Sequence, residues 1–344
     1  MRRHRATGVV FDTNRHRRDV VEVGLGFLRV VLSDGSHRVT DSDGWYDVPS
    51  NLHVRGSLEG EYCTVFKWHV HEDGRRQLYH RGSPYFQWNK SSRDNYRLRS
   101  AMAYHHATCA RHKFSSLLKR EGFSTSHSNV LAHIKIIVDD ASEYWSRWSG
   151  WDSTNGLIRF GRDVPYVLDA VAIYHEYAHC VIDFLTNDGF PCAYSRNDSD
   201  ADRAATAVCE GFADYLACSL KEYPVVLQGE KDHERALASS ASGVISTDDV
   251  YSISLGLSRG LWRLREELGA ELVDGLVVHS LVEISRFSQG CSDSTLLSSI
   301  ETMISVDERY ADGKHLASIA AAFARAGDRS ATAPIEDPPR PDRA

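Results

Sequence analysis

A single apolar segment between Pro165 and Gly189 constrains this chain more than any other feature, because it carries two histidines and a glutamate at helical spacing. Its apolar residues recur on the period of an α-helix and Pro165 suits a first helical turn, so the segment predicts a largely buried helix that ends at Gly189. The polar run within it is His175-Glu176-x-x-His179. Buried imidazoles and carboxylates need partners, and a metal ion would supply them.

The spacing of the two histidines suits metal binding. Residues at i and i+4 lie one turn apart on the same helix face, so His175 and His179 can reach one ion without distortion of the backbone. Glu176 is displaced around the helix, where it can contact a metal-bound water rather than the ion. Chance alone gives this spacing in roughly one chain in twenty. The alternative is three polar residues on a solvated face, but apolar neighbours on nearly every side favour the metal site.

A zinc site needs a third protein ligand, and Glu210 is the candidate. It lies 31 residues after His179, in a run of helical pattern from 209 to 217. Asp214 follows four residues later and therefore shares a helix face with Glu210. We expect Glu210 to bind the metal and Asp214 to accept the free ring N–H of a ligand histidine, which fixes the tautomer of that ring. The alternative is a surface helix that carries two acids.

The rest of the chain divides into a β-rich first part and a mainly helical second part. Residues 1–90 contain short alternating runs separated by turn signals, which predict a β-rich N-terminal module. Residues 91–328 contain a helical segment, a β-branched strand near 130–138 and then mostly helical patterns. The prolines and charges of 329–344 predict a disordered tail. The expected fold class is therefore α+β.

The candidate metal ligands carry a resemblance to a known family. The His-Glu-x-x-His helix followed by Glu210-Gly-x-x-Asp214 resembles the gluzincin zinc metallopeptidases, in particular their fungalysin and thermolysin-like branches. The resemblance covers roughly residues 95–328. It implies a two-lobe catalytic domain, with a small sheet and the zinc helix in 91–195 and a mainly helical lobe in 196–328. The β-rich module resembles the small sandwich or propeptide-like pieces that precede such catalytic domains.

This resemblance implies a zinc-dependent metalloendopeptidase that hydrolyses peptide bonds with a water bound to the zinc. His175, His179 and Glu210 are the implied Zn²⁺ ligands. Glu176 is the implied general base, which takes the proton of the water and passes it to the leaving amine. The family has a histidine in the helical lobe that donates a hydrogen bond to the oxyanion, and Tyr251 stands at that position here. A phenol is also a donor and can serve this role.

The resemblance also implies where a peptide substrate binds. The family has an edge strand with the motif Asn-Ala-aromatic-Trp that pairs with the substrate backbone, and the corresponding run here is Ser142-Glu143-Tyr144-Trp145. Ser142, Tyr144 and Trp145 are therefore the expected substrate-binding residues. Ser142, Glu143 and Tyr251 depart from the family pattern. These departures keep open a second hypothesis, a catalytically impaired zinc-binding relative that acts as a structural or binding module.

Composition excludes several classes of protein. The chain has 40 basic and 47 acidic residues, a net charge of −7, which argues against a nucleic-acid partner. No apolar run approaches the ~20 residues of a membrane helix, so membrane insertion is not expected. The start of the chain shows no secretory signal. This motivates a third hypothesis, that the protein is a cytosolic zinc hydrolase with a non-peptide substrate. The family resemblance instead implies an extracellular enzyme, and we expect a monomer that acts on peptides or proteins.

Overall fold

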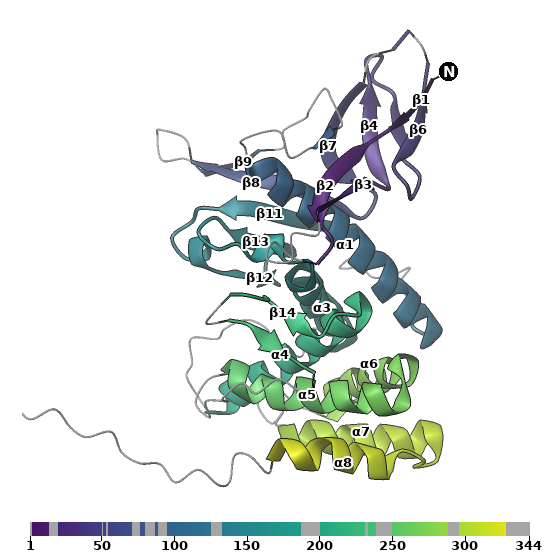
Figure 1. Ribbon diagram of the computed structural model, residues 1–344, viewed down its shortest axis with the longest axis vertical. Helices are drawn as coiled ribbons and strands as arrows, with labels where there is room; N and C mark the ends of the chain where they lie inside the picture. Colours follow the sequence, from purple (N-terminus) through teal and green to yellow (C-terminus); the bar gives the residue numbers. More distant parts are fainter. Residues whose placement is uncertain are drawn as a thin grey trace, which may run out of the picture.

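The computed structural model describes residues 2–13, 20–49, 51–52, 54–70, 76–79, 87–88, 95–124, 133–186, 200–230, 233–238, 250–287 and 296–327. Strands dominate the first half of the chain and helices the second (Figure 1). The α+β class expected from the sequence is therefore confirmed. The predicted disordered tail, 329–344, lies outside the described residues.

The main sheet contains strands from both parts of the chain. Its strands are β4 (Leu28–Leu32), β5 (His37–Val39), β7 (Val54–Gly60), β8 (Cys63–Val70), β9 (Arg76–Tyr79), β11 (Ile134–Asp140), β12 (Ser149–Asp152) and β13 (Leu157–Gly161). Their order is β12-β13-β11-β8-β7-β4-β5, with β9 paired to β8. The interior strand β11 runs parallel to both of its neighbours, β8 and β13, whereas β12 is antiparallel to β13. β12 therefore forms one edge of this sheet.

Smaller sheets flank the main one. They consist of β1 (Arg2–Arg5) with β6 (Trp45–Val48), of β10 (Gln87–Trp88) with β2 (Thr7–Phe11) and β3 (Val20–Gly24), and of β14 (Val225–Val226) with β15 (Arg235–Ala236). The sequence predicts a boundary after residue 90, between the β-rich module and the rest of the chain. In the structure, strands from both sides of this boundary belong to one sheet. β8 precedes the boundary and β11 follows it, yet the two strands pair in register, with Thr64 opposite Lys135. Alternation within each strand gives no information on this pairing, because the partners lie far apart in the sequence.

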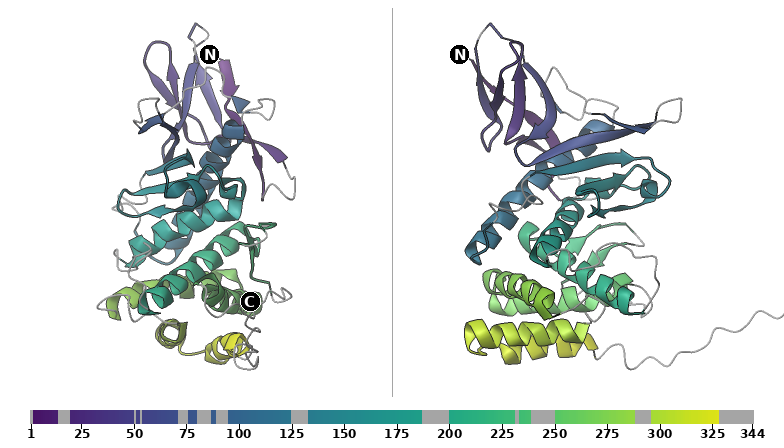
Figure 2. Two further views of the ribbon diagram at one scale, coloured as in Figure 1. Left: turned by 90° about the vertical axis from the view of Figure 1, so that its left-hand side faces the viewer. Right: turned by 180° about the vertical axis from the view of Figure 1, so that it is seen from behind.

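Most of the helices lie below the sheet in the view of Figure 1, whereas the first helix runs obliquely past the strands. The helices are α1 (Asn95–Arg120), α3 (Ala170–Thr186), α4 (Asp200–Lys221), α5 (Val250–Leu268), α6 (Ala270–Phe287), α7 (Leu296–Ala311) and α8 (Leu316–Gly327). α1 packs against β2, β8 and β11, and α3 packs between α1 and α4. Figure 2 shows α7 and α8 side by side at the end of the molecule opposite to β1 and β6. Among the described helices, none is both long and apolar enough to cross a membrane.

The apolar helix predicted from the sequence is α3, and every residue in it except Phe184 is buried. It begins at Ala170 rather than near Pro165, because residues Tyr166–Leu168 form a short 3-10 turn. Asp169 then has extended backbone angles, and its carboxylate Oδ1 accepts a hydrogen bond of 3.0 Å from the amide of Ala172. A side-chain acceptor at this point satisfies one of the free amides of the first turn, so Asp169 caps the helix.

Candidate metal and active site

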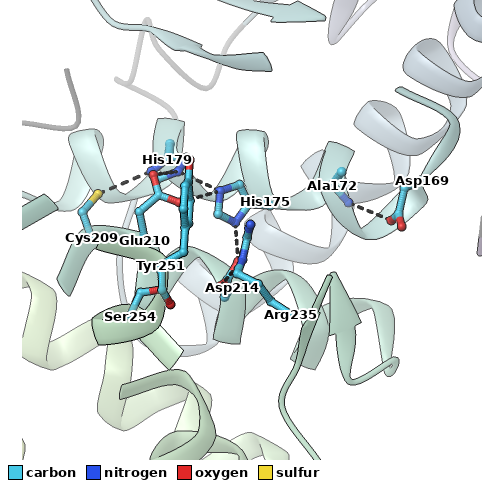
Figure 3. Close-up of polar contacts among 10 residues, drawn as sticks. All are labelled: Asp169, Ala172, His175, His179, Cys209, Glu210, Asp214, Arg235, Tyr251 and Ser254. Carbon is cyan, nitrogen blue, oxygen red and sulfur yellow. Dashed lines mark hydrogen bonds and ion pairs between the residues drawn. The ribbon is translucent and has the colours of Figure 1, made fainter. Parts of the chain in front are cut away.

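The candidate metal ligands from two helices meet in the structure (Figure 3). α3 and α4 pack against each other, and His175 and His179 of α3 face Glu210 of α4. The Nε2 atoms of the two histidines are 3.0 Å apart. Nε2 of His175 lies 3.2 Å from Oε2 of Glu210, and Nε2 of His179 lies 3.5 Å from its Oε1. All three residues are buried.

These separations fit a single divalent metal ion. Ligand atoms at ~2.0–2.1 Å from a tetrahedral zinc ion are about 3.3 Å from one another. On the far side of the first ring, Nδ1 of His175 lies 2.8 Å from Oδ1 of Asp214, which places the ring proton on Nδ1 and leaves a lone pair on Nε2. Oε2 of Glu210 is buried and faces the lone pair of His175 Nε2 at 3.2 Å. A cation between them would satisfy these facing lone pairs.

The charges around the site also favour the binding of a cation. Burial acts to raise the pKa of Glu210, but the neighbouring His179 and His175 outweigh it and hold that pKa well below its ordinary value. Burial acts to lower the pKa of His175, but hydrogen bonds to Asp214 and Glu210 outweigh it and raise that pKa. The Glu210 and Asp214 carboxylates therefore stay ionised, which gives the site the negative charge that would favour a cation.

Glu176 lies beside this group. One ligand atom each from His175, Glu176 and His179 falls within 4.8 Å of the other two. The side chain is buried, and that burial raises the pKa of its carboxyl. A carboxyl group that lies next to a candidate metal site and holds a proton more readily than usual has the properties of a general base that later acts as an acid.

Arg235 is a site residue that the sequence analysis missed. It lies on β15, and its guanidinium binds the Asp214 carboxylate in a bidentate manner, with Nε and Nη2 at 2.7 and 2.8 Å from the two oxygens. Asp214 is thereby held between Arg235 and His175, and its pKa is lowered despite burial. A single arginine on a two-residue strand carries no local pattern that would have identified it.

Tyr251 lies near the start of α5, beside the candidate metal ligands. Its ring packs against the guanidinium of Arg235, whose Cζ is 4.9 Å from the ring centroid. Figure 3 shows the ring beside Glu210. Gly211 lets α5 approach α4 there, because a Cβ atom at this position would lie 2.9 Å from the carbonyl oxygen of Ser254. The structure therefore brings the phenol to the same site as the ligands.

A cavity of about 520 Å³ opens onto these residues. His175, Glu176, His179, Glu210, Arg235 and Tyr251 line one part of it. Aromatic residues from the segment 144–151, among them Tyr144, Trp145 and Trp148, line another part, and β12 borders the cavity along its whole length. A cavity of this size that combines aromatic walls with a cluster of polar groups is typical of a binding site for a small molecule or a peptide segment.

The prediction of an edge strand at 142–145 is wrong. Asp140 accepts a hydrogen bond of 2.9 Å from the amide of Ser142, and the carbonyl of Ser142 accepts one of 2.9 Å from Ser146. These bonds turn the chain into a 3-10 helix at Trp145–Arg147, and the sheet edge follows as β12. Of the expected substrate-binding residues, Tyr144 and Trp145 line the cavity, whereas Ser142 is buried in the turn outside the lining.

Comparisons with known proteins add a likeness of fold. Neither protein-family models nor curated proteins give a match. Among solved structures, the chain is similar to the precursor of protealysin, a metalloproteinase from Serratia proteamaculans. The TM-score is 0.51 at 14% sequence identity, over 78% of this chain and 87% of that chain. At this identity the likeness shows the fold alone, and it agrees with the α+β, thermolysin-like fold expected from the sequence.

Proposed function

We propose that the protein is a zinc-dependent metalloendopeptidase of the gluzincin type, with a peptide or protein as its substrate. The observation that carries this proposal is the meeting of His175, His179 and Glu210, with Glu176 beside them, at a cavity bordered by a sheet edge. The fold likeness to a metalloproteinase precursor supports it. An extracellular location, which the family resemblance implies, and a monomeric state complete the proposal.

A zinc ion bound by His175, His179 and Glu210 would polarise the substrate carbonyl and lower the pKa of a bound water. Glu176 takes the proton of the attacking water and delivers it to the leaving amine, a role that suits a buried carboxyl with a raised pKa. Tyr251 donates a hydrogen bond to the oxyanion.

The remaining residues hold this arrangement and the substrate. Asp214 fixes the ring of His175 and is itself held by Arg235. The outer edge of β12 offers backbone groups for an extended peptide, which would add to the sheet as another strand. Tyr144 and Trp145 would contact side chains of that peptide at the cavity wall.

The test measures hydrolysis and zinc content of the full chain. We expect casein cleavage that stops on chelation and returns with Zn²⁺. Glu176→Gln should retain zinc and lose ~10²–10⁴-fold in kcat/KM, because only the proton acceptor is removed. Glu301→Gln, on the exposed face of α7, is the matched control and should cleave normally. Cleavage that survives Glu176→Gln would overturn the mechanism.

The departure at Tyr251 favours one alternative, a catalytically impaired zinc-binding relative that acts as a binding or structural module. The same experiment distinguishes it from the enzyme. One zinc ion per chain, with no cleavage of casein or of a broad peptide library, would favour the impaired relative. A chain that binds no zinc would contradict both functions.

A further inference from the structure

The second histidine of the site has a sulfur neighbour. Cys209 immediately precedes Glu210 on α4, and its Sγ lies 3.4 Å from Nδ1 of His179 (Figure 3). Both side chains are buried. Nε2, on the other side of the same ring, faces His175 and Glu210. The ring of His179 is therefore held between the candidate metal ligands and the thiol.

The tautomer of His179 decides what this contact does. A neutral imidazole carries one proton, and Nε2 can bind a metal only if the proton sits on Nδ1. Nδ1–H then points at Cys209, whose sulfur is the acceptor at a distance within the range for N–H···S contacts. If the thiol donated instead, the ring proton would sit on Nε2 and face the other ligands.

We propose that Cys209 is the positioning residue for His179: it accepts the Nδ1–H bond, and so fixes the tautomer and orientation in which Nε2 faces the metal. This inference rests on the proposed zinc site. One helix thereby supplies the third ligand, Glu210, and a partner for each histidine ring, with Asp214 on His175 and Cys209 on His179.

The two partners differ in strength. Asp214 is an ionised carboxylate at 2.8 Å, and two hydrogen bonds from Arg235 hold it in place. Cys209 is a thiol, and sulfur is a weaker acceptor at a longer distance, 3.4 Å. His179 is thus the less firmly oriented ligand, and the zinc affinity of the site depends on a contact that a better acceptor can replace.

The test is Zn²⁺ affinity of the full chain, measured by competition with a chromophoric chelator. Cys209→Ala removes the acceptor and should weaken zinc binding by ~10–100-fold, the usual effect of losing a partner of a metal-bound histidine. Cys209→Ser keeps an acceptor and should bind zinc within about threefold of the natural chain. Cys218→Ala, a buried cysteine farther along α4, is the matched control and should leave the affinity unchanged.

Two further readouts separate positioning from general damage. The metal-free melting temperatures of the two alanine variants should agree, and the visible spectrum of the Co²⁺-loaded protein should change for Cys209→Ala but not for Cys218→Ala. Zinc affinity that is equal in Cys209→Ala and the natural chain, or equally weakened in Cys209→Ser and Cys209→Ala, would overturn the inference. Failure of the natural chain to bind zinc would instead overturn the proposed function, and this inference with it.

Discussion

The cavity has two contrasting parts, which we call the floor and the rim. The floor comprises the residues of α3 and α4 that line the cavity. The rim is the segment 140–152, of which residues 144, 145 and 148–152 line the cavity. Each floor residue is placed by a helix, whose apolar face is visible in the sequence as a period of 3.6 residues. The rim has no such regularity, since a turn, a 3-10 helix and a short strand follow one another within thirteen residues.

Contacts between distant residues hold the rim together. Arg159 of β13 binds Asp140 at 2.8 Å and Asp152 at 3.0 Å, and its guanidinium lies over the ring of Trp145. The indole N–H of Trp151 donates to the buried Asp183 of α3, which joins the rim to the floor. In the proposed function the floor carries the chemistry and the rim carries recognition, so changes in the two parts should have different effects.

The largest effect is expected from removal of a floor ligand. His175→Ala should abolish zinc binding and lower hydrolysis by more than ~10³-fold, because the two remaining ligands cannot hold the ion. Metal analysis and casein cleavage measure this. His37→Ala, on the exposed strand β5, is the control and should behave like the natural chain. Equal zinc content in both variants would contradict the proposal that the floor residues bind the metal.

A smaller effect is expected from a change at Asp214, which contacts the candidate ligand His175 but would not itself bind the metal. Asp214→Asn should weaken zinc binding by ~10–100-fold, because His175 loses a charged acceptor. It should also lower the free energy of unfolding by about 3 kcal/mol, because the buried Arg235 loses its bidentate partner. Chelator competition and urea denaturation measure the two effects. A variant that keeps both affinity and stability would show that the Asp214 contact is incidental.

The start of α3 predicts a pH dependence of stability. Burial raises the pKa of Asp169 to about 7 from 3.8, so between these pH values the folded chain binds a proton that the unfolded chain has lost. Stability must therefore fall as the pH rises from 4 to 7. Asp169→Asn keeps a capping oxygen and removes the titration. From pH 5 to pH 8, the natural chain should lose about 2 kcal/mol more than this variant in urea denaturation. Parallel profiles would contradict the prediction.

The smallest effect is expected in the rim. A Cβ atom at Gly150 would lie 3.0 Å from the ring of Trp145, so Gly150→Val should displace that ring from the cavity wall. We expect KM for a peptide to rise about tenfold while kcat and zinc affinity change little, because the floor is untouched. Gly256→Ala, whose Cβ would meet only an ordinary contact with Leu296, is the control. A loss confined to kcat would contradict the proposal that the rim contributes to substrate binding and the floor to the chemical step.

The sequence by itself determined the helices of the floor. The period of α3 and the i, i+4 spacing of His175 and His179 are local properties, and so is the four-residue spacing of Glu210 and Asp214. These spacings predicted which side chains share a helix face, and the structure places them together. The β-rich first part and helical second part were also predicted, because alternation and helical period are read within single segments.

Only the tertiary structure decided the contacts between segments. The pairing of β8 with β11, the bidentate bond of Arg235 to Asp214 and the bonds of Arg159 to its two aspartates each join elements that no local pattern relates. Contacts between segments also explain why the sheet edge lies at β12 and not at 142–145. The Asp140 carboxylate accepts the hydrogen bond that forms the turn at Ser142, and Arg159 on the next strand holds that carboxylate. A periodic pattern reports the face that a segment buries; which partner covers that face depends on the packing of the whole chain.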